Sequence, residues 1–534
     1  MSKPFENIAL SLSGGGYRAA AFHLGAMSYL DQLEYQDISM LKRVKVLSTI
    51  SGGTFTGMVY AMTVAKGQDF KTCFLRLYVL MKEDQLIVKA LEKVNHVKKW
   101  HAPEKSKNLI NAMSEVYQAD YCEHEHLSLM LSPNTSHLDE FSFNATDLFD
   151  AIPFRFQNGG LIGNGNLHIS PEAAAEIRLG DVMAASSCFP GGFEPLVFPN
   201  DFLKAKGSPL DQYWQGQPGY PPEIGIMDGG IVDNQGIESI LLYNKRQKEN
   251  QKPEVGTFII SDVASRNAAE FEVPAVSNMG LLGKVTPRGL TIFLWIVFIL
   301  ALIGIGFTWD DSKVWPLVLS FVAVFAGLGL SLLYWVQAKI GQFVANTIGQ
   351  KTETSPILKN LNILRRTPIA ILFHLVSVRI FSLGDIVESV FMNRIRSLQI
   401  SALFNDPFWS PRILGNNIYS LFTDYDSGKA VESPSDQMLA TTRLAAKMGT
   451  TLWFSDANKE KGMLDVLILG GQINMCYKLL KYLSLKLKND PVYAEFDPET
   501  KASLQTLEDR VRADYQKFKN DERWLLNVLL GDRA

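Results

Sequence analysis

Three short motifs in this sequence carry residue types that together suit acyl transfer. Gly14, Gly15 and Gly16 follow an apolar run, Ser51 stands between a second apolar run and a glycine pair, and Asp228 precedes a further glycine pair. Backbone N–H groups of a glycine loop can stabilise an oxyanion, a serine at a strand-to-helix turn can attack a carbonyl carbon, and a carboxylate can accept the serine proton. The motifs therefore predict a nucleophile, its base and its oxyanion hole.

Each motif taken alone also has an ordinary explanation. The glycine loop could hold a phosphate, although the Gly-Lys-Ser/Thr of a nucleotide-binding loop is missing. Ser51 could cap a helix, and Asp228 could lie in a surface turn. His23 would offer a Ser-His-Asp triad, but a histidine in the helix after a glycine loop is more often a packed residue. We therefore expect a Ser-Asp dyad.

In combination and in this order, the motifs resemble those of the patatin-like phospholipase family. Its signature is a Gly-Gly-Gly-x-Arg loop, a nucleophile-elbow serine and an Asp-Gly-Gly turn, and the segment 181–195 resembles its Ala-Ser-Ser-x-x-Pro-x-x-Phe-x-Pro block. The resemblance implies Ser51 as nucleophile and Asp228 as base. It also implies an oxyanion hole of Gly14, Gly15 and Gly16, and an elbow completed by Gly52 and Gly53. Arg18 matches the loop arginine, expected to order the loop, to form a structural salt bridge or to attract a phosphate-bearing head group.

One position departs from the family pattern. Thr49 stands where the usual Gly-x-Ser-x-Gly elbow has a glycine, and a threonine there crowds the turn. The leading hypothesis is a membrane-anchored serine lipid acyl hydrolase of the phospholipase A or lysophospholipase type. A lipid transacylase and a catalytically idle membrane scaffold are the alternatives, and Thr49 is the best support for the scaffold.

The elements that must position these motifs follow an alternating order. Strand-like segments at 8–12 and 44–50 each precede a helix-like segment, at 19–30 and 52–64. This order favours an α/β fold with a mainly parallel sheet, whose functional loops lie at the carboxyl ends of the strands. The family resemblance implies a patatin-like three-layer arrangement.

Two uncharged runs, 289–309 and 314–337, are each long enough to cross a bilayer. They predict a transmembrane helical hairpin inserted into the α/β fold. Lys284, Arg288 and Lys339 flank the hairpin, so the positive-inside rule places both of its ends in the cytoplasm. The sequence therefore predicts an integral membrane protein with two spans and a catalytic domain on the cytoplasmic side.

A stripe of small residues, Ala323, Gly327 and Ser331, runs along the second predicted span. Such a stripe lets another helix approach closely, either the first span or the hairpin of a second protomer. A homo-oligomer formed through the hairpin is therefore one possibility. A third apolar stretch, 367–381, contains His374 and Arg379, and we expect a buried or interfacial helix there.

We divide the chain into four predicted parts. These are a catalytic core (1–283), the hairpin (284–340), a membrane-proximal helical continuation that completes or covers the core (341–485) and a C-terminal amphipathic helix (486–534). The last assignment rests on apolar residues that recur at steps of three and four, namely Leu504, Leu507, Val511, Tyr515 and Phe518. Packing of this helix on the core is the favoured interpretation.

Charge and cysteine content narrow the function classes. The net charge of −3 argues against nucleic acid as a partner, and the four scattered cysteines favour buried thiols in a reducing compartment. The cluster 122–126 lacks the histidine spacing of a helical zinc motif. We expect no metal and no cofactor, and we expect membrane phospholipid as substrate and the lipid bilayer as partner.

Overall fold

The computed structural model describes residues 3–96, 100, 105–131, 136–217, 221–264, 280–310, 314–348 and 365–531. By its internal contacts the chain divides into two compact units. The first, here the core unit, combines Met1–Ala269 with Val387–Ala534, and the second, the hairpin unit, is Glu270–Ile386. The core unit is thus built from two segments that are far apart in the sequence.

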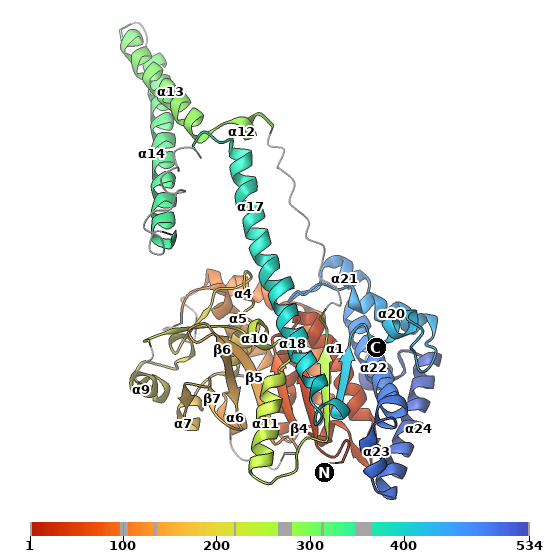
Figure 1. Ribbon diagram of the computed structural model, residues 1–534. Coiled ribbons are helices and arrows are strands. Elements are labelled where there is room, and N and C mark those ends of the chain that lie inside the picture. Colours follow the sequence, from red (N-terminus) through yellow and green to blue (C-terminus); the bar gives the residue numbers. More distant parts are fainter. Residues whose placement is uncertain are drawn as a thin grey trace. The chain divides into compact units, whose positions relative to one another are not determined.

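A mostly parallel sheet forms the centre of the core unit (Figure 1). Its strands lie in the order β12-β11-β1-β4-β5-β6-β7-β8, and β10 pairs with both β5 and β9. Pairing is parallel from β12 to β5 and antiparallel beyond β5, which confirms the predicted α/β class. The bounds are β1 Ile8–Leu12, β4 Val44–Ile50, β5 Glu140–Asp147, β6 Ile152–Gln157, β7 Ile162–Gly163, β8 His168–Ile169, β9 Leu196–Phe198, β10 Ile224–Asp228, β11 Thr257–Asp262 and β12 Ile413–Asn417.

Helices cover both faces of the sheet, because its central strands are apolar on both sides. Along β1, Leu10 belongs to the larger apolar cluster on one face, whereas Ala9 belongs to a second cluster on the other. Along β11, Ile259 and Phe258 alternate in the same way. Near-continuous apolar strands are typical of parallel sheets that are buried on both faces.

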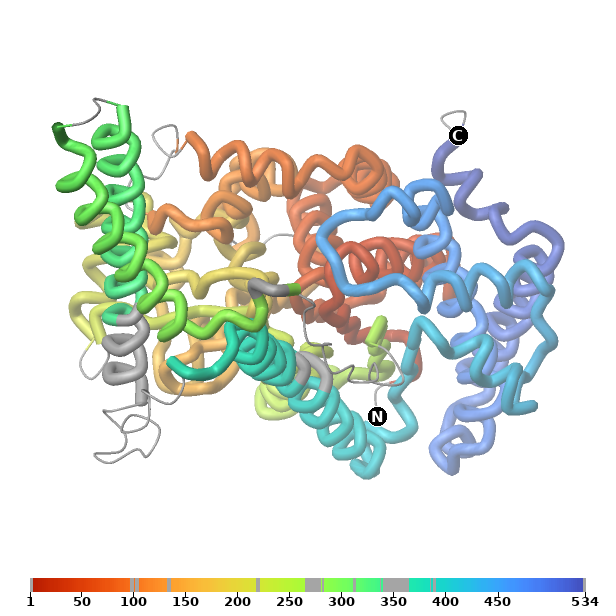
Figure 2. Tube along the Cα trace, turned by 90° about the horizontal axis from the view of Figure 1, so that it is seen from above, coloured from red at the N-terminus to blue at the C-terminus, as the bar shows by residue number. Residues whose placement is uncertain are grey.

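The larger cluster lies among α1 (Gly16–Gln32), α2 (Gly52–Ala65) and α22 (Met463–Lys481). The first and last of these helices lie side by side, although they are far apart in the sequence (Figure 2). The second cluster lies against α11 (Ile237–Glu249) and α18 (Met392–Asn405). Other helices of the core unit include α3 Phe70–Glu83, α4 Leu86–Asn95, α5 Leu109–Val116, α8 Leu179–Ser187, α10 Gly230–Asp233, α20 Asp436–Ala446 and α24 Pro498–Asn520.

The C-terminal part of the chain differs in one respect from the expected helical continuation. It contributes β12, which lengthens the parallel sheet by pairing with β11. The predicted amphipathic helix is α24, and its apolar residues are buried in the larger cluster. Burial in the core unit therefore explains the apolar pattern of α24 without a partner protein or a membrane.

In the hairpin unit, α13 (Pro287–Thr308) and α14 (Val314–Ile348) pack along each other. The windows Pro287–Thr308 and Val314–Val336 have mean hydropathies of 2.8 and 2.3 and are long enough to cross a membrane. Part of the small-residue stripe faces the first helix, since Ala323 is buried and a Cβ on Gly327 would lie 3.5 Å from Phe298. Ser331 is exposed.

Two further apolar helices differ from each other in their burial. Met463–Leu487 also meets the length and hydropathy of a span, but 83% of its window is buried inside the core unit. It is a core helix, because the sheet and α1 already cover its apolar surface. In contrast, α17 (Ile369–Asp385) in the hairpin unit exposes Phe373, Ile380 and Phe381. Of the expected buried or interfacial helix, the interfacial form stays a prediction.

Candidate active site

Ser51 occupies the sharp turn between β4 and α2, with φ 48° and ψ −119°. A positive φ is rare for a residue with a side chain and persists only where its surroundings hold it. The two glycines after it allow close approach of the glycine loop. A Cβ on Gly52 would lie 2.2 Å from the Gly16 oxygen, and a Cβ on Gly53 would lie 2.4 Å from the Leu12 oxygen. Neither position accepts a side chain.

Asp228 is the last residue of β10, and its side chain is 3% exposed. Its N–H donates to the Cys188 carbonyl at 2.9 Å, and its own carbonyl accepts from the Thr146 hydroxyl at 2.8 Å. The carboxylate Oδ1 accepts the N–H of Gly230 at 2.7 Å. These three bonds fix the backbone on both sides of Asp228 and the direction of its carboxylate.

Burial raises the pKa of Asp228 to about 6. The Gly230 N–H and the Ser51 side chain lower this pKa and offset part of the rise. The Ser51 side chain thus lies near enough to act on the pKa of this carboxylate. A carboxylate with this pKa is deprotonated at neutral pH and is a stronger base than an ordinary aspartate. A base of this kind suits a Ser-Asp dyad, whose proton transfer stays a prediction.

The three glycines form the turn between β1 and α1. The N–H of Gly14 donates to the Asn234 carbonyl at 3.2 Å, so a backbone partner already occupies it. Among the hydrogen bonds of the described residues, none uses the N–H of Gly15 or of Gly16. The oxyanion role of the three glycines stays a prediction, and the N–H groups of Gly15 and Gly16 are the two for which no hydrogen bond is seen among the described residues.

Arg18 is buried, and its contacts come from a distant part of the chain. One guanidinium nitrogen donates to the Met448 carbonyl at 2.7 Å and another to the Thr450 hydroxyl at 3.0 Å. Beside them, the Tyr17 N–H donates to the Thr451 carbonyl at 2.8 Å. These bonds fit the loop-ordering role expected of Arg18. Sequence reasoning missed the segment 448–451, which carries no local signal of a site.

His23 is fully buried and serves the glycine loop as a structural residue. Its Nε2 lies 3.0 Å from the Ser13 carbonyl, and its Nδ1 lies 2.9 Å from the Ser261 hydroxyl. Since a carbonyl only accepts, Nε2 carries the proton and Nδ1 accepts from the serine. Burial lowers the pKa of His23 to about 4, so the ring is neutral at pH 7. Both ring nitrogens are thus engaged, as expected for a packed histidine.

The turn that follows Asp228 is backed by α18. The Gln399 amide donates to the Val232 carbonyl at 3.4 Å, and Arg396 forms an ion pair of 2.8 Å with the buried Asp262 at the end of β11. The sequence pattern did not identify α18 as a neighbour of the site. Its position follows from the second segment of the core unit, which folds back onto the first.

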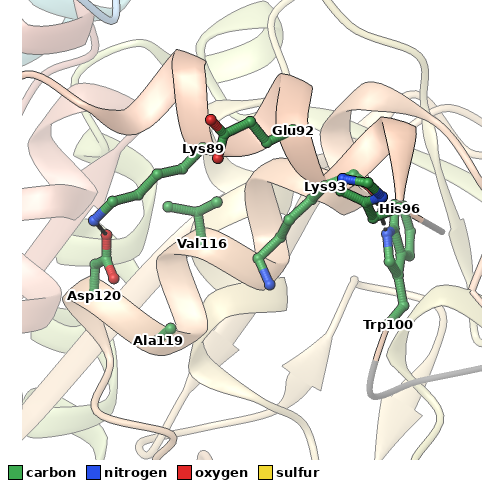
Figure 3. Close-up of a pocket in the computed structure, with 8 residues that line it drawn as sticks. All are labelled: Lys89, Glu92, Lys93, His96, Trp100, Val116, Ala119 and Asp120. Carbon is green, nitrogen blue, oxygen red and sulfur yellow. Dashed lines mark hydrogen bonds and ion pairs between the residues drawn. The ribbon is translucent and has the colours of Figure 1, made fainter. Parts of the chain in front are cut away.

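A cavity of about 280 Å³ lies elsewhere in the core unit, beside α4 and α5 (Figure 3). It is lined by Lys89, Glu92, Lys93, His96, Trp100, Val116, Ala119 and Asp120. None of these residues belongs to the three motifs. Among the described residues, the arrangement that suits acyl transfer remains Ser51 at the elbow, the buried Asp228 carboxylate and the glycine N–H groups beside the elbow.

Residues 10–241 match a family model described as patatin-like phospholipase. The chain contains a patatin-like phospholipase domain. The matched residues include both Ser51 and Asp228. A comparison with curated proteins finds no match.

Two solved structures are similar to the chain. Human GIVD cytosolic phospholipase A2 in complex with methyl gamma-linolenyl fluorophosphonate has 14% identity and a TM-score of 0.32, over 48% of this chain and 40% of that chain. VipD from Legionella pneumophila has 12% identity and a TM-score of 0.23, over 96% of this chain and 92% of that chain. The chain thus spans less than half the length of the human enzyme.

The core of the patatin-like domain continues beyond the matched residues. Strands β11 and β12, helix α22 and the segment 448–451 all lie after residue 241 and are part of the same core unit. The domain is therefore completed by sequence from both sides of the hairpin unit.

Proposed function

We propose that the chain is a membrane-anchored serine lipid acyl hydrolase of the phospholipase A or lysophospholipase type. Ser51 Oγ attacks the ester carbonyl carbon while Asp228 accepts the hydroxyl proton. The N–H groups of Gly15 and Gly16 stabilise the oxyanion, each by roughly 3 kcal/mol. The proton then passes to the leaving lysolipid or glycerol oxygen as the C–O bond breaks. Water deprotonated by Asp228 attacks the acyl-serine and releases the fatty acid.

The observation that carries this proposal is a buried carboxylate with a pKa of about 6, on which the side chain of the elbow serine acts. A serine hydroxyl is a weak nucleophile unless a base adjoins it. The strained backbone of Ser51 supports the same role, since strain of this kind clusters at functional turns. The match to the patatin-like family supports the substrate class.

The test uses the full chain and its Ser51→Ala and Asp228→Asn variants, purified in detergent. A fluorophosphonate probe should label the wild type, and Ser51→Ala should not be labelled. Wild type should release fatty acid from phosphatidylcholine vesicles, and both variants should lose at least about 10³-fold in rate. Ser39→Ala, which changes a serine of β3 (Ile38–Ser39) outside the three motifs, is the matched control. Equal labelling of wild type and Ser51→Ala would overturn the proposal, and acylated lipid products would identify a transacylase.

The membrane anchor is the second part of the proposal. It is supported by the lengths and hydropathies of α13 and α14 and by their exposed aromatic side chains, such as Phe307 and Phe325. Lys284, Arg288 and Lys339 lie at or beyond the outer ends of the two apolar windows, which favours two spans with the catalytic unit in the cytoplasm. An anchor of this kind would hold the enzyme beside its insoluble substrate and raise the frequency of their encounters. Self-association through the hairpin stays a prediction.

Topology can be tested with a membrane-impermeant maleimide on intact cells. The four native thiols are buried, so their background labelling should be low. Ser312→Cys, in the connection between the two spans, should be labelled from outside. Ser427→Cys, at an exposed position of the core unit, should be labelled only after the cells are permeabilised. The reverse pattern would contradict the cytoplasmic placement.

A further inference from the structure

Four buried polar groups form a chain of hydrogen bonds beside the backbone of the nucleophile. They are the hydroxyls of Thr49, Thr54 and Ser186 and the carbonyl of Asn144. The Thr49 hydroxyl lies 2.9 Å from the Thr54 hydroxyl, which lies 2.7 Å from the hydroxyl of Ser186. Ser186 Oγ donates to the Asn144 carbonyl at 2.8 Å and accepts the N–H of Ser51 at 3.0 Å. The three hydroxyl side chains are inaccessible to solvent. The chain therefore joins β4, α2, α8 and β5 at the elbow.

The direction of these hydrogen bonds follows from the number of protons. Ser186 has one hydroxyl proton, and the Asn144 carbonyl can only accept, so that proton points to Asn144. Thr54 must then donate to Ser186, and Thr49 must donate to Thr54. The oxygen of Ser186 is left to accept twice, from Thr54 and from the N–H of Ser51. Each member of the chain thus fixes the next.

We propose that Ser186 is a positioning residue for the nucleophile, because its hydroxyl oxygen holds the N–H of Ser51 and so keeps the elbow in its left-handed conformation. A residue with φ of 48° returns to an ordinary conformation unless its neighbours prevent it. The N–H bond to Ser186 acts directly on that dihedral angle. The inference rests on the proposed role of Ser51 and adds the group that aims its hydroxyl.

The same cluster accounts for the threonine at position 49. A Cβ on Gly57 would lie 2.3 Å from Cγ2 of Thr49, so glycine at position 57 of α2 makes room for the threonine methyl. The hydroxyl of Thr49 meanwhile enters the chain that leads to Ser186. Thr49 is thereby packed against α2, and the departure from the usual elbow is matched by a compensating glycine. It no longer supports an idle scaffold.

The test compares Ser186→Ala with Ser187→Ala in the full chain. The two serines are neighbours on α8, both are buried, and the Ser187 hydroxyl donates to the Met183 carbonyl of its own helix at 2.8 Å. Ser186→Ala should lower kcat and the rate of fluorophosphonate labelling by about 10- to 100-fold, with KM changed less than about twofold. Ser187→Ala should stay within about threefold of wild type in both rates.

Thr54→Val keeps the shape of the side chain and removes the donor to Ser186. It should lower kcat by about three- to tenfold, which is less than Ser186→Ala. Thr49→Val should lower kcat least of the three, because Thr49 is the hydroxyl farthest from the Ser51 N–H along the series of hydrogen bonds. A purely structural role would instead make activity follow the melting temperature of each variant. Loss of kcat in variants that melt within about 3 °C of wild type supports positioning.

Two failures can be told apart. If Ser186→Ala and Ser187→Ala behave alike while wild type is labelled at Ser51, the positioning role is wrong and the proposed function stands. If wild type and Ser51→Ala are labelled equally, the proposed function itself is wrong. An ordered decline in kcat, with KM unchanged, is the result that supports both.

Discussion

Replacing Asp228 by asparagine should abolish activity and at the same time stabilise the protein above neutral pH. The carboxylate is 3% exposed, and burial raises its pKa from 3.8 to about 6. The folded state therefore binds the proton more tightly than the unfolded chain does. As pH rises from about 4 to about 6, the folded protein must hold a charge that water would solvate better, and stability falls. The carboxamide stands in for the protonated acid and carries no such charge.

The size of the effect follows from the two pKa values. At 1.36 kcal/mol for each pH unit, the shift from 3.8 to about 6 corresponds to about 3 kcal/mol against the charged form. Roughly half of this is already lost at pH 5, and the rest is lost by pH 8. For a folded unit of several hundred residues, about 1 kcal/mol changes the melting temperature by about 1 °C. Asp228→Asn should melt about 3 °C above wild type at pH 8 and about 1.5 °C above it at pH 5.

The assay is intrinsic-fluorescence melting of the full chain in one detergent, at pH 5, 6, 7 and 8. Ser51→Ala is the matched control, because it removes activity but leaves the buried carboxylate in place. Its melting temperature should fall with rising pH in parallel with wild type. If Asp228→Asn melts below wild type at pH 8, or if the difference in melting temperature narrows as pH rises, burial does not raise the pKa of the carboxylate. Asp228 would then not be an activated base.

Further predictions concern the base, the loop and the elbow. Fatty-acid release by wild type should rise with pH through about 6 and level off near neutrality, as Asp228 loses its proton, and a rate independent of pH from 5 to 8 would contradict its role as base. Arg18→Ala should lower the free energy of unfolding by about 1 to 3 kcal/mol, because the Met448 carbonyl loses a buried donor, and a melting curve equal to that of wild type would contradict the loop-ordering role. Gly57→Ala should destabilise the protein by about 1 to 3 kcal/mol, and Thr49→Ala in the same chain should recover most of the loss. Additive effects in that double-mutant cycle would show that the two residues do not share space.

The sequence predicted the parts of the site that are local in the chain. Ser51 and Asp228 each follow an apolar strand and precede glycines, and such a pattern locates a turn at the end of a strand. The alternation of strand-like and helix-like segments predicted the parallel sheet that places Ser51 after the carboxyl end of β4. It did not predict that β10, which ends at Asp228, pairs antiparallel with β5. These inferences needed only neighbouring residues and their periodicity.

Contacts over long separations could not be predicted in this way. The partner of Arg18 lies 430 residues away, and nothing in the residues around Met448 marks it. The loss of Gly14 as a donor depends on the Asn234 carbonyl, and three consecutive glycines look equivalent in the sequence. Strand β12 is short and partly polar, so it becomes a strand only because β11 offers it an edge.

Hydropathy alone was also insufficient for one helix. The segment Met463–Leu487 has the composition of a span, yet it packs inside the core unit. The reason is its pairing with α1, where Gly471 lies so close to the Phe22 carbonyl that a Cβ would clash at 2.0 Å. Gly471 thus allows close packing against another helix of the protein, which mean hydropathy does not detect.

The division of the core unit has a consequence for synthesis on the ribosome. The residues that supply the nucleophile and the base are made first, but the groups that hold Arg18 and Tyr17 emerge only after residue 448. When Asp228 has emerged from the ribosome, the nascent chain still lacks β12, α22 and the segment 448–451 that contacts Arg18 and Tyr17. A chain truncated before residue 448 would therefore lack the groups that hold the glycine loop.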